Sequence, residues 1–365
     1  MKINIILFIT AVFLICCLGA CGRGSAGSSD ETADTGHIIS SENKADSKGS
    51  DNTGQAAGKD GKSLQIVTTI FPEYDWVQNI LGEQAAGAEV SMLLDNGVDL
   101  HSFQPTAEDI LKIGTCDMFI YVGGESDSWV EDALAEAVNK DMVVINLLDV
   151  LGNQVKEEKI VEGMEGEEEE EGEAVSGADS ENGEQETEYD EHVWLSLKNT
   201  SALVDYIAES LAEIDADNAE TYKANAASYI GKLTALDKEY ETAVNEANVS
   251  TLLFGDRFPF RYLTDDYGLS YYAAFAGCSA ETEASFETII FLASKVDELS
   301  LHSILTIEGT DHRIAETIRD NTGNKNQQIL TLDSMQSTTS RDVGDGKTYL
   351  SIMEGNLEVL KEALK

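Results

Sequence analysis

The sequence predicts an α/β protein of two lobes, each with a parallel sheet, joined by one long helix. Strand-like and helix-like segments alternate in two separate runs of the chain. Such alternation is typical of βαβ units and therefore of parallel sheet. Between the two runs lies a stretch of about 30 residues with helical periodicity, long enough at about 45 Å to connect two lobes.

In the first run, short segments rich in β-branched residues predict strands, and the amphipathic segments between them predict helices. The expected strands are 65–69, 89–94, 117–122 and 142–147, and the expected helices are 75–81, 106–113 and 129–138. Thr106 suits the N-cap of its helix, and Glu108 and Asp109 suit the positive end of the helix dipole.

The middle of the chain is predicted to be helical over 199–214 and again over 217–247. In the longer helix, apolar and tyrosine side chains recur three and four residues apart, as on the buried face of a helix. The α/β pattern then resumes. Its expected strands are 251–254, 270–274, 303–307 and 328–332, and its expected helices are 260–266, 282–298, 311–321 and 349–364.

The N-terminus predicts export and lipidation. Residues 3–18 are almost wholly apolar but too few to span a membrane comfortably. They lead into Leu18-Gly-Ala-Cys21, which resembles the lipobox of bacterial lipoproteins, with Cys21 as the lipidated residue. A plain signal peptide or a membrane anchor is the alternative. We expect Cys116 and Cys278 to remain as separate thiols. For Cys278, a small buried residue is favoured over a residue near the site.

These features divide the chain into a signal peptide, a flexible linker and two lobes with a helical region between them. The expected bounds are 1–20 for the signal peptide, 21–63 for a flexible linker, 64–198 for the N-terminal lobe, 199–248 for the helical region and 249–365 for the C-terminal lobe. Residues 157–191, rich in glutamate, are expected to form a disordered insertion in the N-terminal lobe. The insertion either solubilises the protein or gathers cations.

The net charge of the chain limits the kinds of molecule that the protein can bind. With 68 acidic against 24 basic residues, the formal net charge is −44. Nucleic acid is excluded as a partner, because its phosphates require lysine and arginine. The balance suits a protein that attracts cations.

Two of the five histidines lie in sequence frames that suit a metal site. His101 and His192 each follow an acidic stretch, precede an aromatic residue and fall where a strand or loop gives way to a helix. Neutral imidazole is a common ligand of zinc, and His101 follows a parallel strand, at the edge of the sheet where ligands collect.

Several motifs in order resemble the cluster 9 solute-binding lipoproteins of bacterial zinc/manganese ABC importers. The motifs are Ile66-Val-Thr-Thr, Gly-x-Asp-x-His at His101, Tyr121-Val-Gly-Gly with Trp129, the charged insertion, His192-Val-Trp and Leu332-Asp333-Ser334. The resemblance extends from about Leu64 to Lys365. It implies two lobes, one long rigid helix and a single buried metal with two ligands from each lobe. By matching position, His101 and His192 are the N-lobe ligands and Asp333 is a C-lobe ligand.

The fourth ligand departs from the family pattern. Counting back without gaps from Tyr262 puts Arg257 in the ligand position, and arginine cannot bind a cation. Asp256 is therefore our preferred fourth ligand, with Glu308 second. His312, Glu281 and water remain open, and Arg257 could instead orient a ligating carboxylate.

The resemblance implies capture and delivery of a divalent cation, without chemistry on the metal. The expected protein is a monomer, anchored by lipid on the extracytoplasmic face of the cell membrane, that docks on an ABC permease. Zinc is favoured over manganese. An enzyme is not expected, because the sequence has neither His-Glu-x-x-His nor a nucleophile frame. The sequence is also compatible with a surface adhesin and with a receptor that has lost its metal.

Overall fold

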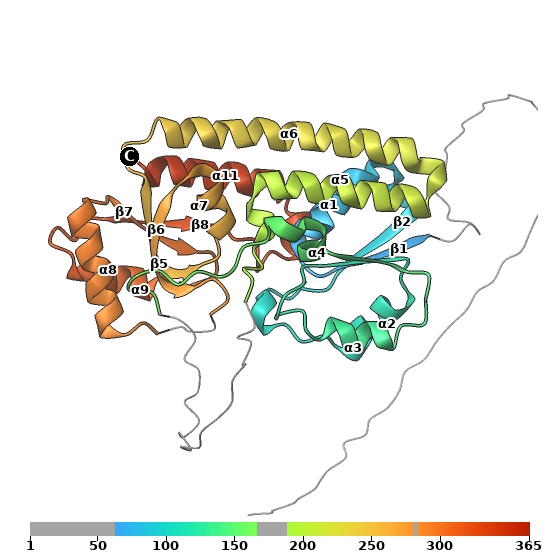
Figure 1. Cartoon of the computed structure of the whole chain (residues 1–365), viewed down its shortest axis with the longest axis horizontal. Helices are drawn as coiled ribbons and strands as arrows, with labels where there is room; N and C mark the ends of the chain where they lie inside the picture. The colour runs from blue at the N-terminus through green and yellow to red at the C-terminus, as the bar shows by residue number, and fades with distance from the viewer. Residues whose placement is uncertain (1–62, 166–187, 280–282) are drawn as a thin grey trace, which may run out of the picture. The chain divides into compact units, whose positions relative to one another are not determined.

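The protein is described by a computed structural model over residues 63–165, 188–279 and 283–365. These residues belong to one compact unit, Thr53–Lys365. Two four-stranded parallel sheets form two lobes within it, which confirms the predicted fold class (Figure 1). The signal peptide, Cys21, nearly all of the linker and most of the acidic insertion lie outside the described residues.

The N-terminal sheet has the strand order β2-β1-β3-β4, and every neighbouring pair is parallel. Its strands are β1 (Leu64–Thr68), β2 (Ala88–Met92), β3 (Met118–Tyr121) and β4 (Val143–Asn146). Its helices are α1 (Phe71–Leu81), α2 (Ala107–Thr115), α3 (Val130–Ala135) and α4 (Leu147–Leu151). Thr106 caps α2 by accepting a hydrogen bond from the Asp109 backbone, as predicted.

The C-terminal sheet has the order β6-β5-β7-β8 and is also wholly parallel. Its strands are β5 (Thr251–Phe258), β6 (Ser270–Ala276), β7 (Ser303–Ile307) and β8 (Gln328–Leu332). Its helices are α7 (Arg261–Tyr267), α8 (Phe286–Leu299), α9 (Arg313–Asn321), α10 (Ser340–Gly344) and α11 (Tyr349–Ala363). Strand β5 runs four residues beyond its predicted end, through a register shift against β6.

The long helix α6 (Ala219–Asn245) follows α5 (Leu197–Ile214) and packs on helices of both lobes (Figure 1). Its N-terminal half is bonded to α1, where Asn225 donates to the Ile80 carbonyl at 2.9 Å and Tyr229 to Asp75 at 3.1 Å. Its C-terminal half is bonded to α11, where Tyr240 donates to the Met353 carbonyl at 2.6 Å. Because α6 has buried hydrogen bonds to both lobes, it fixes one relative to the other.

The lobes also meet through the chain around Trp194. The Trp194 indole donates to the Ser334 carbonyl at 2.8 Å, and the Tyr349 hydroxyl donates to the Trp194 carbonyl at 2.6 Å. All three residues are almost completely buried. Among the described residues, none of the helices combines the length and apolar character needed to cross a membrane.

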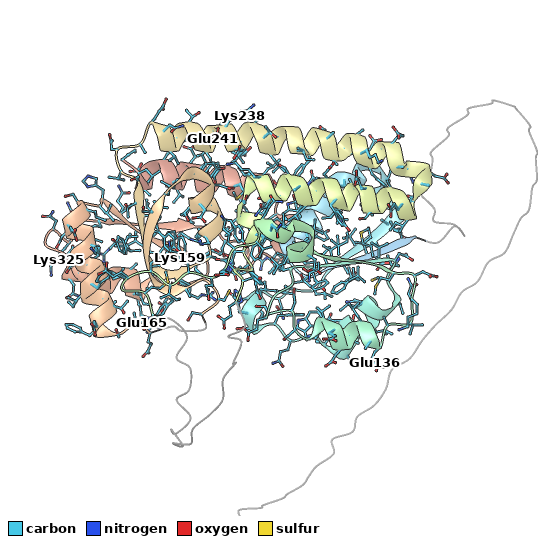
Figure 2. The ribbon with its side chains drawn as sticks, in the orientation of Figure 1. Glu136, Lys159, Glu165, Lys238, Glu241 and Lys325 are labelled. Atoms are coloured by element: carbon cyan, nitrogen blue, oxygen red, sulfur yellow. The ribbon has the colours of Figure 1, made fainter. Side chains whose placement is uncertain are left out.

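The described ends of the acidic segment pack on the C-terminal lobe instead of extending into solvent. The Glu165 backbone donates to the Ala274 carbonyl at 2.9 Å, and Tyr271 donates to the Lys159 carbonyl at 3.4 Å. Figure 2 labels Lys159 and Glu165 against this lobe. Disorder was expected here from the glutamate content, but Val161 and Met164 pack against the hydrophobic core. Residues 166–187 lie outside the described residues.

Candidate metal centre

His101 is held at the carboxyl end of the N-terminal sheet. It lies in a short 3-10 turn, Leu100–Ser102, in the loop after β2. Asp99 caps this turn, because its Oδ1 accepts the His101 backbone N–H at 3.0 Å. The His101 Nδ1 lies 2.7 Å from Ser126 Oγ, in the loop after β3. The turn and the serine together orient the ring so that its Nε2 faces His192.

His192 is also held by a hydrogen bond to its Nδ1. It directly precedes the turn Val193–Leu195, and its side chain is completely buried. Asp190 Oδ1 accepts both the backbone N–H and the ring Nδ1–H of His192, each at 2.9 Å. A carboxylate on one ring nitrogen fixes the tautomer and leaves the lone pair of Nε2 free to bind a metal.

The two Nε2 atoms face each other at 3.2 Å. Two nitrogens bound at about 2.0–2.1 Å to one tetrahedral zinc lie about 3.3–3.4 Å apart. Without a cation, this contact requires a proton on one Nε2; with a cation, both lone pairs point at it. The histidine pair is therefore already spaced as metal ligands.

The pKa values of the two rings shift in opposite directions. Burial, together with the nearby His192, lowers the pKa of His101 to about 3, so its ring is neutral at physiological pH. Burial also disfavours the charged form of His192, but the Asp190 carboxylate outweighs it, so the pKa of His192 lies above its usual value. Protons therefore compete with metal mainly at His192.

Glu191 lies behind His101. Its Oε1 accepts the Ser126 backbone N–H at 2.9 Å, while its Oε2 lies 3.5 Å from His101 Nδ1. This Oε2 is buried and has no hydrogen-bond partner among the described residues. A ring N–H on His101 Nδ1, which is the tautomer of a metal-bound Nε2, would face both this oxygen and Ser126.

Cys278 joins the two histidines. One ligand atom from each of His101, His192 and Cys278 lies within 4.8 Å of the other two, the arrangement expected of metal ligands. Cys278 follows β6, so it reaches the site from the C-terminal lobe. From the sequence, Cys278 was expected to be a small buried residue outside the site. Its position just beyond a predicted parallel strand was the signal that could have identified it.

Glycine allows the close approach on either side of the pair. A Cβ atom on Gly277 would lie 2.9 Å from the Phe258 carbonyl and 3.1 Å from His192 Cε1. At Gly124, where φ is +83°, a Cβ would lie 2.3 Å from Glu191 Oε1. Real Cβ atoms do not approach so closely, so side chains at either position would displace the groups around the imidazoles.

The two predicted carboxylate ligands lie at the carboxyl ends of their strands but outside this three-residue group. Asp256 Oδ2 accepts from the Ile307 backbone at 3.2 Å and from Thr310 Oγ1 at 2.9 Å, so it joins β5 to the loop after β7. Asp333 Oδ1 accepts the Met335 backbone N–H at 2.9 Å. The structure therefore brings together two of the four predicted ligands.

Glu308 and Arg257, the alternative ligand and the candidate orienting residue, have other partners. Glu308 accepts from the Ser334 backbone at 2.6 Å and from Ser334 Oγ at 2.8 Å, so it holds the loop after β8. Burial, with the charge of Asp333, raises the pKa of Glu308 to about 7.

Arg257 forms an ion pair with Asp99 of the opposite lobe, at 2.6 Å. Burial alone would raise the pKa of Asp99, but the guanidinium outweighs it and holds this pKa below its usual value. Asp99, Asp256 and Arg257 line an interlobe cavity of about 360 Å³. His312 lines the same cavity, while Glu281 lies outside the described residues.

A known protein family matches most of the described part of this chain. The family described as ZnuA, zinc-uptake complex component A, periplasmic, matches residues 66–363. The chain belongs to this family. It is one of the solute-binding proteins that the sequence motifs resemble, so the recognition from sequence is confirmed.

Individual relatives support the same assignment. The zinc-binding lipoprotein AdcA of Streptococcus pneumoniae is 33% identical over 307 residues, which are 83% of this chain and 56% of AdcA. The chain thus spans about half the length of that relative. The high-affinity zinc uptake system protein ZnuA of Bacillus subtilis is 31% identical over 316 residues, 87% of this chain and 92% of ZnuA.

A solved structure agrees with the fold. The crystal structure of the Zn(II)-bound ZnuA-like domain of Streptococcus pneumoniae AdcA superposes with a TM-score of 0.63. It is 28% identical in sequence, and the match covers 83% of this chain and 99% of that domain.

Proposed function

We propose that this chain is the zinc-binding receptor of an ABC importer, and that it captures the ion outside the cytoplasmic membrane. The observation that carries the proposal is the pair of Nε2 atoms at 3.2 Å, each ring held by a polar group on its other nitrogen. Relatives named for zinc binding and zinc uptake support the choice of ion.

His101 and His192 are the proposed N-lobe ligands. Asp256 and Asp333 stay predictions from the sequence, because each is held by the backbone of its own lobe and lies outside the histidine group. Glu308 is likewise held by a backbone group of its own lobe, the Ser334 N–H. We propose that Arg257 acts through Asp99, which caps the His101 turn, and that it does not contact the metal.

Zinc is proposed over manganese because imidazole ligands suit zinc, whereas manganese prefers sites built from oxygen. At sites of this kind zinc also binds more tightly than manganese. The ion is cargo, so the receptor needs only to surround it and release it.

Delivery requires partners outside this chain. We propose that the receptor docks as a monomer on the permease of a metal importer and that a lipid at Cys21 holds it at the outer face of the membrane. The lipobox-like residues 18–21 and the lipoprotein name of the AdcA relative support the anchor. The family consists of receptors, and we propose no catalytic role.

The test is metal titration of the chelator-stripped protein with zinc and with manganese. We expect one zinc ion per chain, bound more tightly than manganese. His101→Ala and His192→Ala should each weaken zinc binding at least about 100-fold, since even residues that only support a ligand are worth 10–100-fold.

His302→Ala is the matched control, because His302 is exposed and far along the chain from both frames. It should bind zinc as the wild type does. Asp256→Ala and Asp333→Ala, titrated in parallel, test the two predicted carboxylates. An absence of tight binding of either ion by the wild type would overturn the receptor proposal and favour a receptor that has lost its metal.

A further inference from the structure

We propose that Cys278 binds the metal as a thiolate and is the C-lobe ligand that completes a His₂Cys set with His101 and His192. The inference rests on the proposed function and adds to it a ligand type and a basis for selecting zinc. The three side chains could bind one metal ion together, because one ligand atom of each residue lies within 4.8 Å of the other two.

The position of Cys278 supports this role. His101 and His192 belong to the N-terminal lobe, residues 64–198, whereas Cys278 follows β6 of the C-terminal sheet. A metal bound to all three would therefore connect the two lobes. Gly277 makes this geometry possible, because a side chain there would meet His192 at 3.1 Å.

The loop that carries Cys278 is anchored to the same segment as His192. The Cys278 backbone N–H donates to Glu158 Oε1 at 3.2 Å, and the Glu158 backbone in turn donates to the Glu188 carbonyl at 3.0 Å. Residues 157 and 189 form a bridge beside them. The segment that delivers His192 thus also positions the thiol.

The thiolate would determine the class of metal. Sulfur is a soft ligand that favours zinc over the harder manganese, whereas carboxylates accept both. When the metal binds, the S–H bond breaks, the sulfur–metal bond forms and the proton leaves to solvent. No oxidant or reductant takes part. Three protein ligands leave the fourth position of a tetrahedral zinc for water or a carboxylate.

The test replaces zinc by cobalt(II), whose bond to a thiolate gives a sulfur-to-metal charge-transfer band in the near ultraviolet. The full chain, kept reduced, should show this band on binding one cobalt ion. Cys278→Ser should lose the band and bind zinc at least about 100-fold more weakly, with a much smaller change for manganese.

Cys116→Ser is the matched control, because Cys116 is a buried free thiol that belongs to the core of the N-terminal lobe. It should retain both the band and the zinc affinity. A second measurement, alkylation followed by mass spectrometry, should find Cys278 protected when zinc is present and alkylated when a chelator has removed the metal.

The outcomes separate the two proposals. Tight zinc binding that depends on His101 but gives no charge-transfer band, and no protection of Cys278, overturns the thiolate ligand and leaves the receptor proposal standing. Failure of the wild type to bind zinc or cobalt overturns both. A band that persists in Cys278→Ser assigns it to another cysteine and also overturns the inference.

Discussion

At the scale of single residues, the proposed site consists of two histidines that would bind the metal and of neighbouring side chains that orient their rings. Ser126 and Asp190 each contact the Nδ1 of one imidazole, so that the two Nε2 atoms meet at 3.2 Å. Glu191 has a buried oxygen, 3.5 Å from His101 Nδ1, without a hydrogen-bond partner in the part of the chain that the structure describes. A buried orphaned oxygen is costly, and it is explained if the metal-bound tautomer of His101 faces it.

Glu191→Gln should weaken zinc binding about 10-fold, because the amide keeps one oxygen for the Ser126 N–H but loses the carboxylate behind His101. Competition titration against a zinc chelator measures the change. Glu188→Gln is the control, since Glu188 is exposed on the same segment. Equal zinc affinity in the wild type and Glu191→Gln would remove the role given to Glu191.

At the scale of elements, strand ends and one helix decide the architecture. Apart from His192, which precedes the turn Val193–Leu195, the residues singled out as ligands follow β2, β6, β7 and β8 or lie near the end of β5, because parallel strands place their carboxyl ends along one edge. The helix α6 then holds the two sheets together through buried tyrosines and an asparagine. Lys238 and Glu241, labelled in Figure 2, lie on the solvent side of this helix.

Tyr240→Phe should destabilise the protein by about 1 kcal/mol, because it deletes the hydrogen bond from α6 to the Met353 carbonyl of α11 in a buried contact. Thermal unfolding measures the effect. Tyr206→Phe, at an exposed position of α5, should change stability by less than about 0.5 kcal/mol. If the two variants melted at the same temperature, the bond between α6 and α11 would contribute nothing measurable.

At the scale of the whole molecule, buried carboxyl groups set the pH dependence of stability. Burial raises the pKa of Asp127 to about 7 and that of Asp75 to about 6, both from an ordinary value of 3.8. The folded protein therefore binds protons that the unfolded chain has already released. A carboxyl with a raised pKa stabilises the fold at low pH, and this stability is lost as the pH rises to the folded value.

The lowered pKa of His101 acts in the opposite direction, but the raised pKa values of Asp127, Asp75 and Glu308 outweigh it. The metal-free protein should therefore melt at a lower temperature at pH 8 than at pH 5, with the change concentrated between about pH 4 and 7. Asp127 alone accounts for roughly 2–4 kcal/mol of it. Thermal unfolding across this range, in the presence of a chelator, measures the slope. Asp127→Asn should flatten it, and a wild-type melting temperature that rises with pH would contradict the prediction.

The sequence by itself determined the alternation of strands and helices, the long helix and the two histidine frames. These features are local, because hydrophobic periodicity and short motifs are read along the chain. The strands over 303–307 and 328–332 have the predicted bounds, while β5 extends past its predicted end because a register shift continues its pairing with β6.

Only the tertiary structure decided which side chains meet. Asp256 was the preferred fourth ligand, yet its Oδ2 accepts hydrogen bonds from Ile307 and Thr310, which lie about 50 residues further along the chain. Cys278 has no metal motif around it, yet the fold places it beside His101 and His192. The physical reason is that the proposed ligands come from two lobes, so which side chains lie together depends on long-range packing that no local pattern encodes.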